Sequence, residues 1–224
     1  MRAVLFIKRR KMKLFYRICA AVLVCAAAIS ILAGCKESGE AETEQMTYSG
    51  MPEYDVGDIE KYIKPFVYMG LTVYRENSET AAEALWADIV SSVEVISYPR
   101  EQLEYYAEQE RAKYRYYASR EDIAYDELLE SLGVTEESIL DTARGFVKDD
   151  LVLAYIVYKA DISLTDAEKE AHTDKYAEKL SEVYGVDSAY IKNNMSEQVY
   201  DAMLYDKAME YLLLNNTVYS TQSK

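Results

Sequence analysis

The chain has 224 residues, long enough for one or two small domains with a hydrophobic core. Its 39 acidic and 25 basic residues give a formal net charge of −14. A surface of this charge repels nucleic-acid phosphates and anionic lipid headgroups, so we expect no nucleic-acid partner. The acidic excess otherwise indicates solvated helix faces.

The N-terminal segment has the features of a secretory signal. Seven basic residues and no acidic residue lie within residues 1–17, and an uncharged apolar run follows over 18–33. The run ends in Leu-Ala-Gly-Cys, which matches the bacterial lipobox, a motif whose cysteine is lipidated. We therefore predict a lipoprotein signal peptide over residues 1–34 and lipidation of Cys35.

This prediction places the body of the chain outside the cytoplasm, lipid-anchored to the cell membrane. The alternative is an uncleaved membrane span over 18–35, a length near the lower limit for spanning. That alternative also tethers the body on the extracytoplasmic side. Met12 offers a second start site, because a complete basic region follows it.

The body offers little reactive chemistry. Cys19 and Cys25 lie inside the signal segment and Cys35 is the lipidation site, so no cysteine remains for a disulfide or a Cys/His dyad. The single histidine, His172, lies in an acidic stretch and is predicted to be a solvated helix residue that cannot form a typical zinc site alone. No glycine-rich phosphate loop occurs. We expect no enzyme activity, no metal and no cofactor.

Removing the signal segment takes away seven positive charges, so the formal net charge falls from −14 to −21. Residues 35–57 are polar, acidic and aperiodic, and they are predicted to form a flexible stalk. Residues 58–78 form a β-prone segment that Pro65 and Gly70 interrupt, so any strand is expected to be short or at an edge.

Residues 79–218 are predicted to form a helical domain, and 219–224 a short tail. Few glycines and prolines interrupt this part of the chain, and cap signals such as Thr135, Gly133 and the Thr165-x-x-Glu box mark helix ends. The β-branched run at 151–158 could form a strand, but its helical flanks favour a buried helix. The expected helices are 80–96, one beginning near Pro99, 125–132, 135–159, 165–184, 187–193 and 196–216.

The helix that begins near Pro99 has an unusual composition. Its sequence EQLEYYAEQERAKYRYYASRE carries five tyrosines among mostly charged residues. At 100° per residue the apolar positions form two stripes that cover about half the circumference, more than one helix contact needs. The final helix is apolar on nearly all sides, and we expect it to be the buried central helix of the body. The two stripes are Leu103, Tyr106, Tyr114 and Tyr117, and Tyr105, Ala112 and Tyr116.

Several segments, in their order, resemble the substrate-binding part of the chaperone trigger factor, in its lipoprotein form. VKDDLVLAYIVYKADISLTDAEKEAHTDKYAEKLSEVYGV resembles a family helix that ends in L-x-x-I-A-x-x-x-x-I-x-V-T-D-E-E, and MLYDKAMEYLLLNNTV resembles the closing helix K-x-L-D-F-L-x-x-N-A. DIEKYIKPFVYMGLTV resembles the family strand Y-V-x-L-G-x-Y-K-G-L-x-V. The matching residues are Thr165, Asp166 and Glu168 in the capping turn, and Lys207, Leu212, Asn215 and Val218 in the closing pattern.

The resemblance covers roughly residues 58–218 and implies a mainly α fold with elongated multi-helix arms, as in the trigger factor C-terminal domain and SurA-like chaperones. Two family features are missing. Only twelve residues separate Val73 from Trp86, where the family carries a prolyl isomerase domain, and a domain needs about 50 or more. The ribosome-binding signature G-F-R-x-G-x-x-P is also absent.

The resemblance therefore implies an ATP-independent holdase that binds unfolded or exported polypeptides, without isomerase activity and without a ribosome partner. The alternatives are a helical adaptor for one dedicated protein partner and a residual peptidyl-prolyl isomerase. Tyrosine and methionine suit a holdase, because both offer apolar area without fixed geometry. Tyr106, Tyr114 and Tyr117 are expected to be core, and the candidate client-binding residues are Tyr105, Tyr116, Tyr155, Tyr158, Met195 and Met203.

Overall fold

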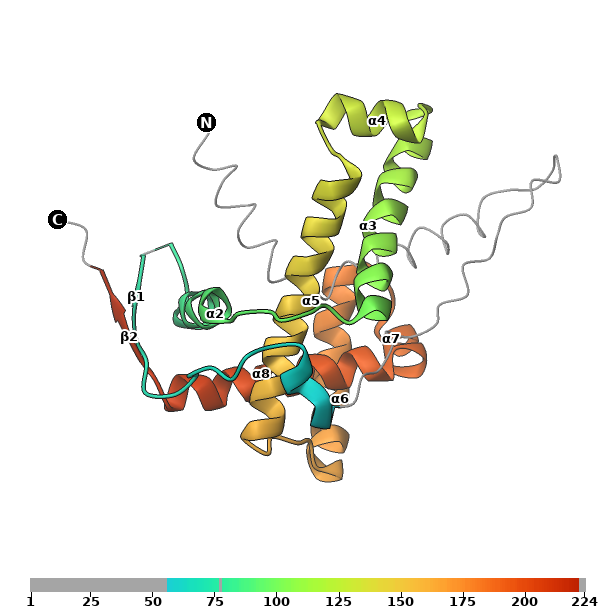
Figure 1. The fold of residues 1–224 in the computed structure, drawn as a ribbon. Coiled ribbons are helices and arrows are strands. Elements are labelled where there is room, and N and C mark those ends of the chain that lie inside the picture. The colour runs from blue at the N-terminus through green and yellow to red at the C-terminus, as the bar shows by residue number, and fades with distance from the viewer. Residues whose placement is uncertain (1–55, 77, 222–224) are drawn as a thin grey trace.

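The computed structural model describes residues 56–76 and 78–221, and in this part of the chain it is mainly helical (Figure 1). It contains seven α-helices and one two-stranded sheet. In chain order the elements are the 3-10 helix Val56–Lys61, β1 Thr72–Arg75, α2 Ala81–Ser92, α3 Arg100–Glu121, α4 Tyr125–Leu132, α5 Glu136–Lys159, α6 Asp166–Tyr184, α7 Ser188–Asn194, α8 Ser196–Leu214 and β2 Thr217–Ser220.

The helix ends follow the capping residues of the sequence. Thr80, Thr135 and Thr165 each accept a hydrogen bond from the backbone N–H three residues ahead, and the residue there bonds back to the cap. Gly133 and Gly185 end their helices in the left-handed conformation, which glycine adopts without strain. All seven predicted helices are present, including the buried helix through residues 151–158. The first ends at Ser92 rather than at residue 96, and the last ends at Leu214 rather than at residue 216.

The β structure differs from the expectation in one respect. The predicted short strand exists as β1, which is preceded by the 3-10 helix and an extended loop. Its partner β2 was not predicted, and it includes two residues assigned to the tail. The two strands pair in parallel, with Thr72 opposite Thr217 and Val73 opposite Val218. The two strands lie far apart in the sequence, so no local sequence pattern predicts that they pair.

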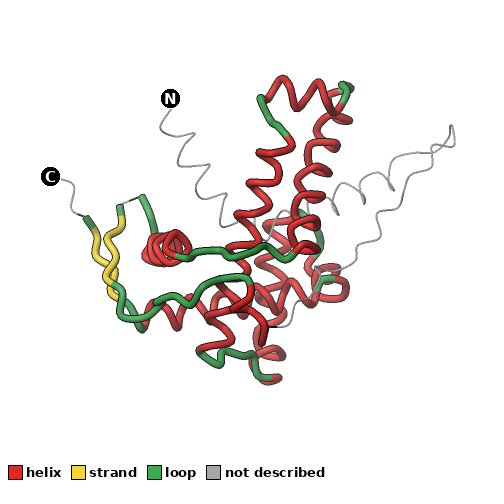
Figure 2. The backbone as a smooth tube through the Cα atoms, viewed as in Figure 1, coloured by secondary structure: helices red, strands yellow, loops and turns green. Residues whose placement is uncertain are grey.

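Helices α3, α4 and α5 form a hairpin that projects from the body of the molecule, with α4 at its tip (Figure 1). Helix α5 continues down into the body, where it packs against α8, which crosses the base. The sheet lies at the far end of α8, beside α2 (Figure 2). The molecule therefore has two extremities, the hairpin and the sheet, joined through α5 and α8.

Three hydrophobic cores hold these parts together. The main core lies where the 3-10 helix, α2, α5 and α8 meet, and it includes Ile63, Leu85, Leu151, Ile156 and Leu212. A small core between the hairpin helices is built from Ala107, Leu129, Ile139 and Ala143. A third joins α6, α7 and α8. Its buried residues are Ala177, Leu180, Ile191, Met195, Val199 and Met203.

An ion pair fastens the start of α6 to α8. Lys207 donates hydrogen bonds to the Ser163 carbonyl (2.8 Å) and to Glu168 (2.6 Å), the residue that completes the Thr165 capping box. These contacts hold the pKa of Glu168 down to about 2, with Lys207 as the largest cause and the Thr165 backbone next. The two segments that carry most of the family resemblance therefore touch one another.

The final helix is only partly as expected. Along most of α8 the buried side chains face its neighbours α2, α5, α6 and α7. Near its C-terminal end, Leu213 and Leu214 are exposed, because no described element covers that side. The expectation of a helix buried on all sides is wrong there.

No helix among the described residues is long and apolar enough to cross a membrane. The predicted signal peptide, the lipidation site Cys35 and most of the predicted stalk lie outside the described residues.

A pair of substitutions in α8 tests the main core. Leu212 is fully buried, whereas Leu214 is 80% exposed two positions later. Leu212→Ala should lower the free energy of unfolding by about 2–5 kcal/mol, because it leaves a cavity. Leu214→Ala should change it by no more than about 0.5 kcal/mol. Urea unfolding followed by circular dichroism measures both, and equal effects would contradict this core.

Candidate functional site

The tyrosines of α3 are half-buried rather than divided into core and surface stripes. The fully buried residues of α3 are three alanines together with Gln102 and Glu110. Tyr105 and Tyr116 lie at intermediate exposure, as do Tyr106 and Tyr114. Tyr117 is 37% exposed, so its assignment to the core is wrong. Small alanines where α3 packs against α5 let the two helices approach closely. The larger tyrosine rings lie at the edges of this contact.

Three of the half-buried rings have neighbours on α3 or α5. The Tyr106 hydroxyl donates to Asp150 of α5, and its ring lies 5.3 Å from that of Phe146. Burial raises the pKa of Tyr114, and the nearby Glu110 adds to the effect. The guanidinium of Arg120 donates to the Tyr116 hydroxyl at 3.1 Å. These rings therefore contribute packing area to the hairpin.

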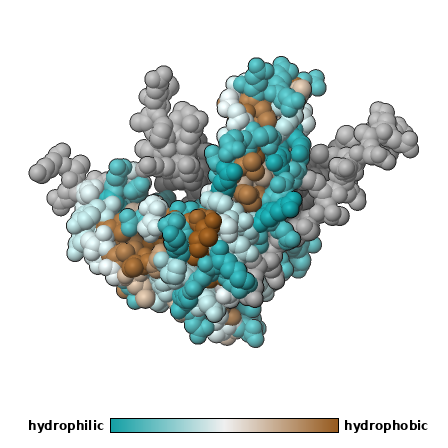
Figure 3. All heavy atoms as spheres, viewed as in Figure 1, coloured by the Kyte–Doolittle hydropathy of each residue, from teal (hydrophilic) through white to brown (hydrophobic). Residues whose placement is uncertain are grey.

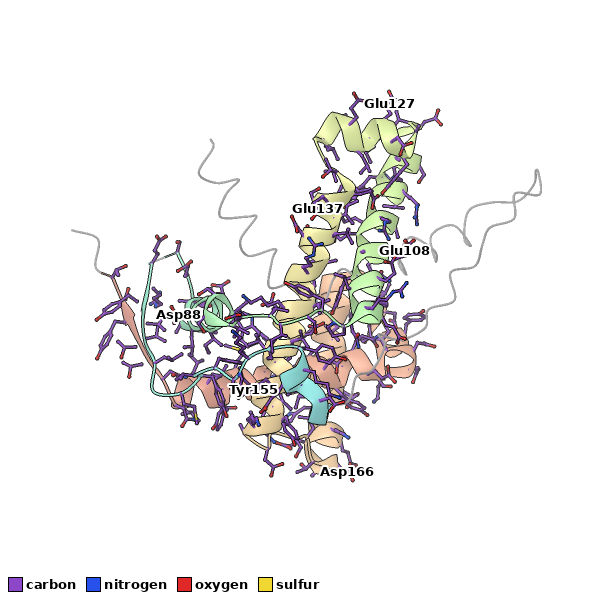
Figure 4. The ribbon with its side chains drawn as sticks, in the orientation of Figure 1. Asp88, Glu108, Glu127, Glu137, Tyr155 and Asp166 are labelled. Atoms are coloured by element: carbon purple, nitrogen blue, oxygen red, sulfur yellow. The ribbon has the colours of Figure 1, made fainter. Side chains whose placement is uncertain are left out.

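The outer faces of the hairpin are charged. Arg111 bonds to Glu104 at 2.8 Å and to Glu136 across the hairpin at 3.1 Å, and Lys113 pairs with the buried Glu110. Figure 4 shows Glu108, Glu127 and Glu137 spread along the arm. Tyr105 and Tyr116 remain partly exposed on this arm, and their role as client-binding residues stays a prediction.

Three predicted client-binding residues are buried in the cores. Tyr155 packs against Phe66, with ring centroids 4.6 Å apart, and lies near the crossing of α5 and α8 (Figure 4). Met195 and Met203 are 6% and 4% exposed in the core of α6, α7 and α8. These side chains are unavailable to a partner in this conformation, so their placement in an open crevice is corrected.

Tyr158 is the one predicted residue with a largely exposed ring, at 52%. It lies near the C-terminal end of α5, with the Lys159 ammonium 5.6 Å from its centroid. The structure therefore does not bring the six candidates together. Two lie on the hairpin, two near the end of α5 and two in the core of α6, α7 and α8.

A different set of residues forms an exposed apolar region. Three segments meet at the end of the molecule: the loop before β1, the last turn of α8, and the sheet. Figure 3 shows hydrophobic surface between this end and the base of the hairpin, whereas the outer face of the hairpin is mostly hydrophilic. We call the region the sheet-end surface. It comprises Val67, Met69, Tyr74, Leu213, Leu214 and Tyr219, six of the eleven exposed large hydrophobic residues found in the described chain.

Asn216 holds these three segments in place. Its side-chain amide donates to the Tyr68 carbonyl (3.0 Å) and accepts from the Leu71 N–H (2.8 Å). The neighbouring Asn215 carbonyl accepts from the N–H of Gly70, whose φ of +72° favours glycine. The Tyr211 hydroxyl also lies 3.0 Å from the Met69 sulfur. Hydrogen bonds therefore fix the backbone that carries the exposed side chains.

The sheet has one covered face and one open face. Val73 and Val218 point to the side covered by α2, and Val73 is buried. Tyr74 and Tyr219, one position further along, point to the opposite side. Their rings stack with centroids 5.7 Å apart and an interplanar angle of 28°. The open face therefore presents two adjacent aromatic rings to solvent.

A separate hollow of about 340 Å³ lies between α8 and the connection from α5 to α6. Its walls include Ile162, Leu164, Tyr200 and Asp201. The Asp201 side chain remains exposed, but the protein atoms crowded around it displace water. This desolvation, together with repulsion from Asp150 and Glu197, raises the Asp201 pKa to about 6.

Asp201 should make stability depend on pH. A carboxyl group whose pKa is raised on folding binds more protons in the native state between about pH 4 and 6. The contribution of Asp201 to the free energy of unfolding therefore increases as the pH falls from about 6 to about 4. At pH 7 the charged carboxylate destabilises the fold. Asp201→Asn should raise the Tm at pH 7 and weaken this dependence. The exposed α2 residue Asp88 provides a charge-matched control. Asp88→Asn should change neither the Tm at pH 7 nor its dependence on pH, and thermal melts of each variant at pH 4.5 and 7 measure both.

Sequence reasoning missed the sheet-end surface. The apolar residues 67–74 were assigned to a β-prone segment and 213–214 to a buried helix, and only the pairing of β1 with β2 shows that they share one exposed end. Comparisons of the chain with protein-family models, with curated proteins and with solved structures found no match.

Proposed function

We propose that the protein is an ATP-independent holdase that binds non-native polypeptides at the sheet-end surface. The proposal includes the lipid anchor on Cys35, which places the body at the extracytoplasmic face of the membrane. The observation that carries it is the concentration of exposed apolar side chains at one end of a strongly acidic chain.

The chemistry of the sheet-end surface suits a client without fixed structure. Tyr74 and Tyr219 offer ring faces to an apolar chain while their hydroxyls stay in water. Met69 and Leu214 add flexible aliphatic area beside them. Exposed apolar regions of this kind on an otherwise polar protein mark interaction sites. The acidic remainder keeps the protein and its bound client soluble.

We also infer that the chain is related to the substrate-binding part of trigger factor. The contact of Lys207 with Glu168 supports this, because it joins the two segments that carry the resemblance. The projecting hairpin of α3, α4 and α5 fits the multi-helix arms of that family (Figure 1). On this proposal the family relationship extends to the helical body alone.

The proposed function excludes prolyl isomerisation and ribosome binding. β1 ends at Arg75 and α2 begins at Ala81, so only a short loop occupies the position where the family carries its isomerase domain. The net charge of −14, or −21 without the signal segment, opposes binding to ribosomal RNA.

An aggregation assay tests the proposal. The full chain in detergent micelles should suppress light scattering by a chemically denatured client as it is diluted, without ATP, and micelles alone should not. The double variant Tyr74→Ser/Leu214→Ser should need about tenfold more protein for the same effect, because two apolar contacts are lost.

The matched control carries the same two changes at exposed residues elsewhere. Leu132 lies at the hairpin tip and Tyr190 on α7, so Leu132→Ser/Tyr190→Ser should act like the wild type. Equal loss in both double variants would contradict the assignment of the surface. No suppression at several-fold molar excess would overturn the holdase function, and a crosslinked partner that is always the same folded protein would favour an adaptor.

A further inference from the structure

The sheet has an unpaired edge along β1. The N–H of Thr217 donates to the Leu71 carbonyl and the N–H of Thr221 to the Arg75 carbonyl, so odd-numbered residues of this segment face β2. By the alternation of a strand, the backbone groups of Thr72 and Tyr74 point away from β2. No described residue bonds to these outward groups.

No helix covers this edge within the described chain. α2 packs against both β1 and β2, as an element lying on a face of the sheet does. α8 meets the sheet at β2. The side chains of Thr72 and Tyr74 are both exposed, because they lie on the open face of the sheet.

A two-stranded parallel sheet is an incomplete unit. Parallel sheets are normally larger and covered on both faces, and isolated strand pairs are marginally stable. Here one face is covered by α2 and the other is open, and each strand has four residues. A third strand beside β1 would satisfy the outward N–H and C=O groups, which only another extended backbone can match in spacing.

The side chains at this edge indicate which strand it accepts. The stacked rings of Tyr74 and Tyr219 form a ladder across the open face, and a third strand beside β1 would place a side chain next to Tyr74. An aromatic or β-branched side chain fits that position.

Charge disfavours a second copy of this chain as the occupant. Glu76 and Glu79 follow β1, and the Arg75 guanidinium is held by the Glu79 carbonyl at 2.6 Å. Two copies brought edge to edge would join two bodies that each carry a net charge of −14. A neutral or basic segment meets no such repulsion.

We infer that the outer edge of β1 captures an extended, neutral or basic segment of a non-native polypeptide by adding it to the sheet as a third strand. The inference rests on the proposed holdase function and names the manner of client recognition. Backbone pairing supplies affinity that does not depend on the client sequence, and the tyrosine ladder favours clients with alternating aromatic or β-branched residues.

The test uses Thr72, whose N–H points outward. Thr72→Pro removes that donor and places a ring at the edge, but leaves the bonds between β1 and β2 intact. Thr72→Val keeps the N–H and is the matched control. The probe is a fluorescent nine-residue peptide with valine and tyrosine at odd positions and lysine and threonine at even positions, and its binding to the full chain in micelles is followed by anisotropy.

Thr72→Pro should weaken binding of the peptide about tenfold or more, and Thr72→Val should leave it within about twofold. Peptides N-methylated at odd or at even positions provide a second test on the unaltered protein. One methylated set should lose binding and the other should keep it, because only one set of amides faces β1. Equal affinity for both sets would overturn the inference, as would a peptide-induced dimer paired through β1.

The aggregation assay separates this inference from the proposed function. If the wild type and Thr72→Pro suppress aggregation equally well and bind the peptide equally well, edge capture is wrong and the holdase stands. If the wild type fails to suppress aggregation, the holdase is wrong whatever the peptide does. Circular dichroism of each variant distinguishes lost binding from lost folding.

Discussion

The packing of α5 against α8 in the main core is the contact on which the rest of the structure depends. Val147, Leu151 and Ile156 lie on the buried face of α5, and Leu212 of α8 belongs to the same core. Helix α5 carries the hairpin away from this crossing, and α8 carries the sheet and the core of α6 and α7. The described body contains no cysteine, so no disulfide within it fixes the extremities, which depend on burial of apolar area and on hydrogen bonds such as those of Asn216.

Two adjacent acidic residues of α5 fasten it to α2 and α3. Asp149 accepts a hydrogen bond from the Trp86 indole of α2 at 3.3 Å, and Asp150 accepts one from Tyr106 of α3. Neighbouring positions on a helix point in different directions, so the two carboxylates bind α5 to helices on two sides. The many tyrosines serve the same end in the hairpin, where each ring packs and its hydroxyl reaches a polar partner or water.

The helices could be predicted from the sequence, because their ends depend on local residues. Thr135, Gly133 and the Thr165 capping box placed those ends within a residue or two. The sheet and the exposed surface could not be predicted, because they depend on contacts between residues about 145 positions apart. The same limit explains the misplaced candidates. Met203 and Tyr155 have the chemistry of a binding residue, but only the tertiary packing decides that they are buried.

The pairing of β1 with β2 also has a consequence for the order of folding. β1 begins at Thr72, and its partner β2 begins at Thr217, about 145 residues later. As a chain emerges N-terminus first, β1 is synthesised well before the strand that pairs with it. The hairpin helices can form early from contacts close in sequence, whereas the sheet closes last. A product cut short before β2 would leave both edges of β1 unpaired, and such exposed strands are what cellular proteases and chaperones recognise.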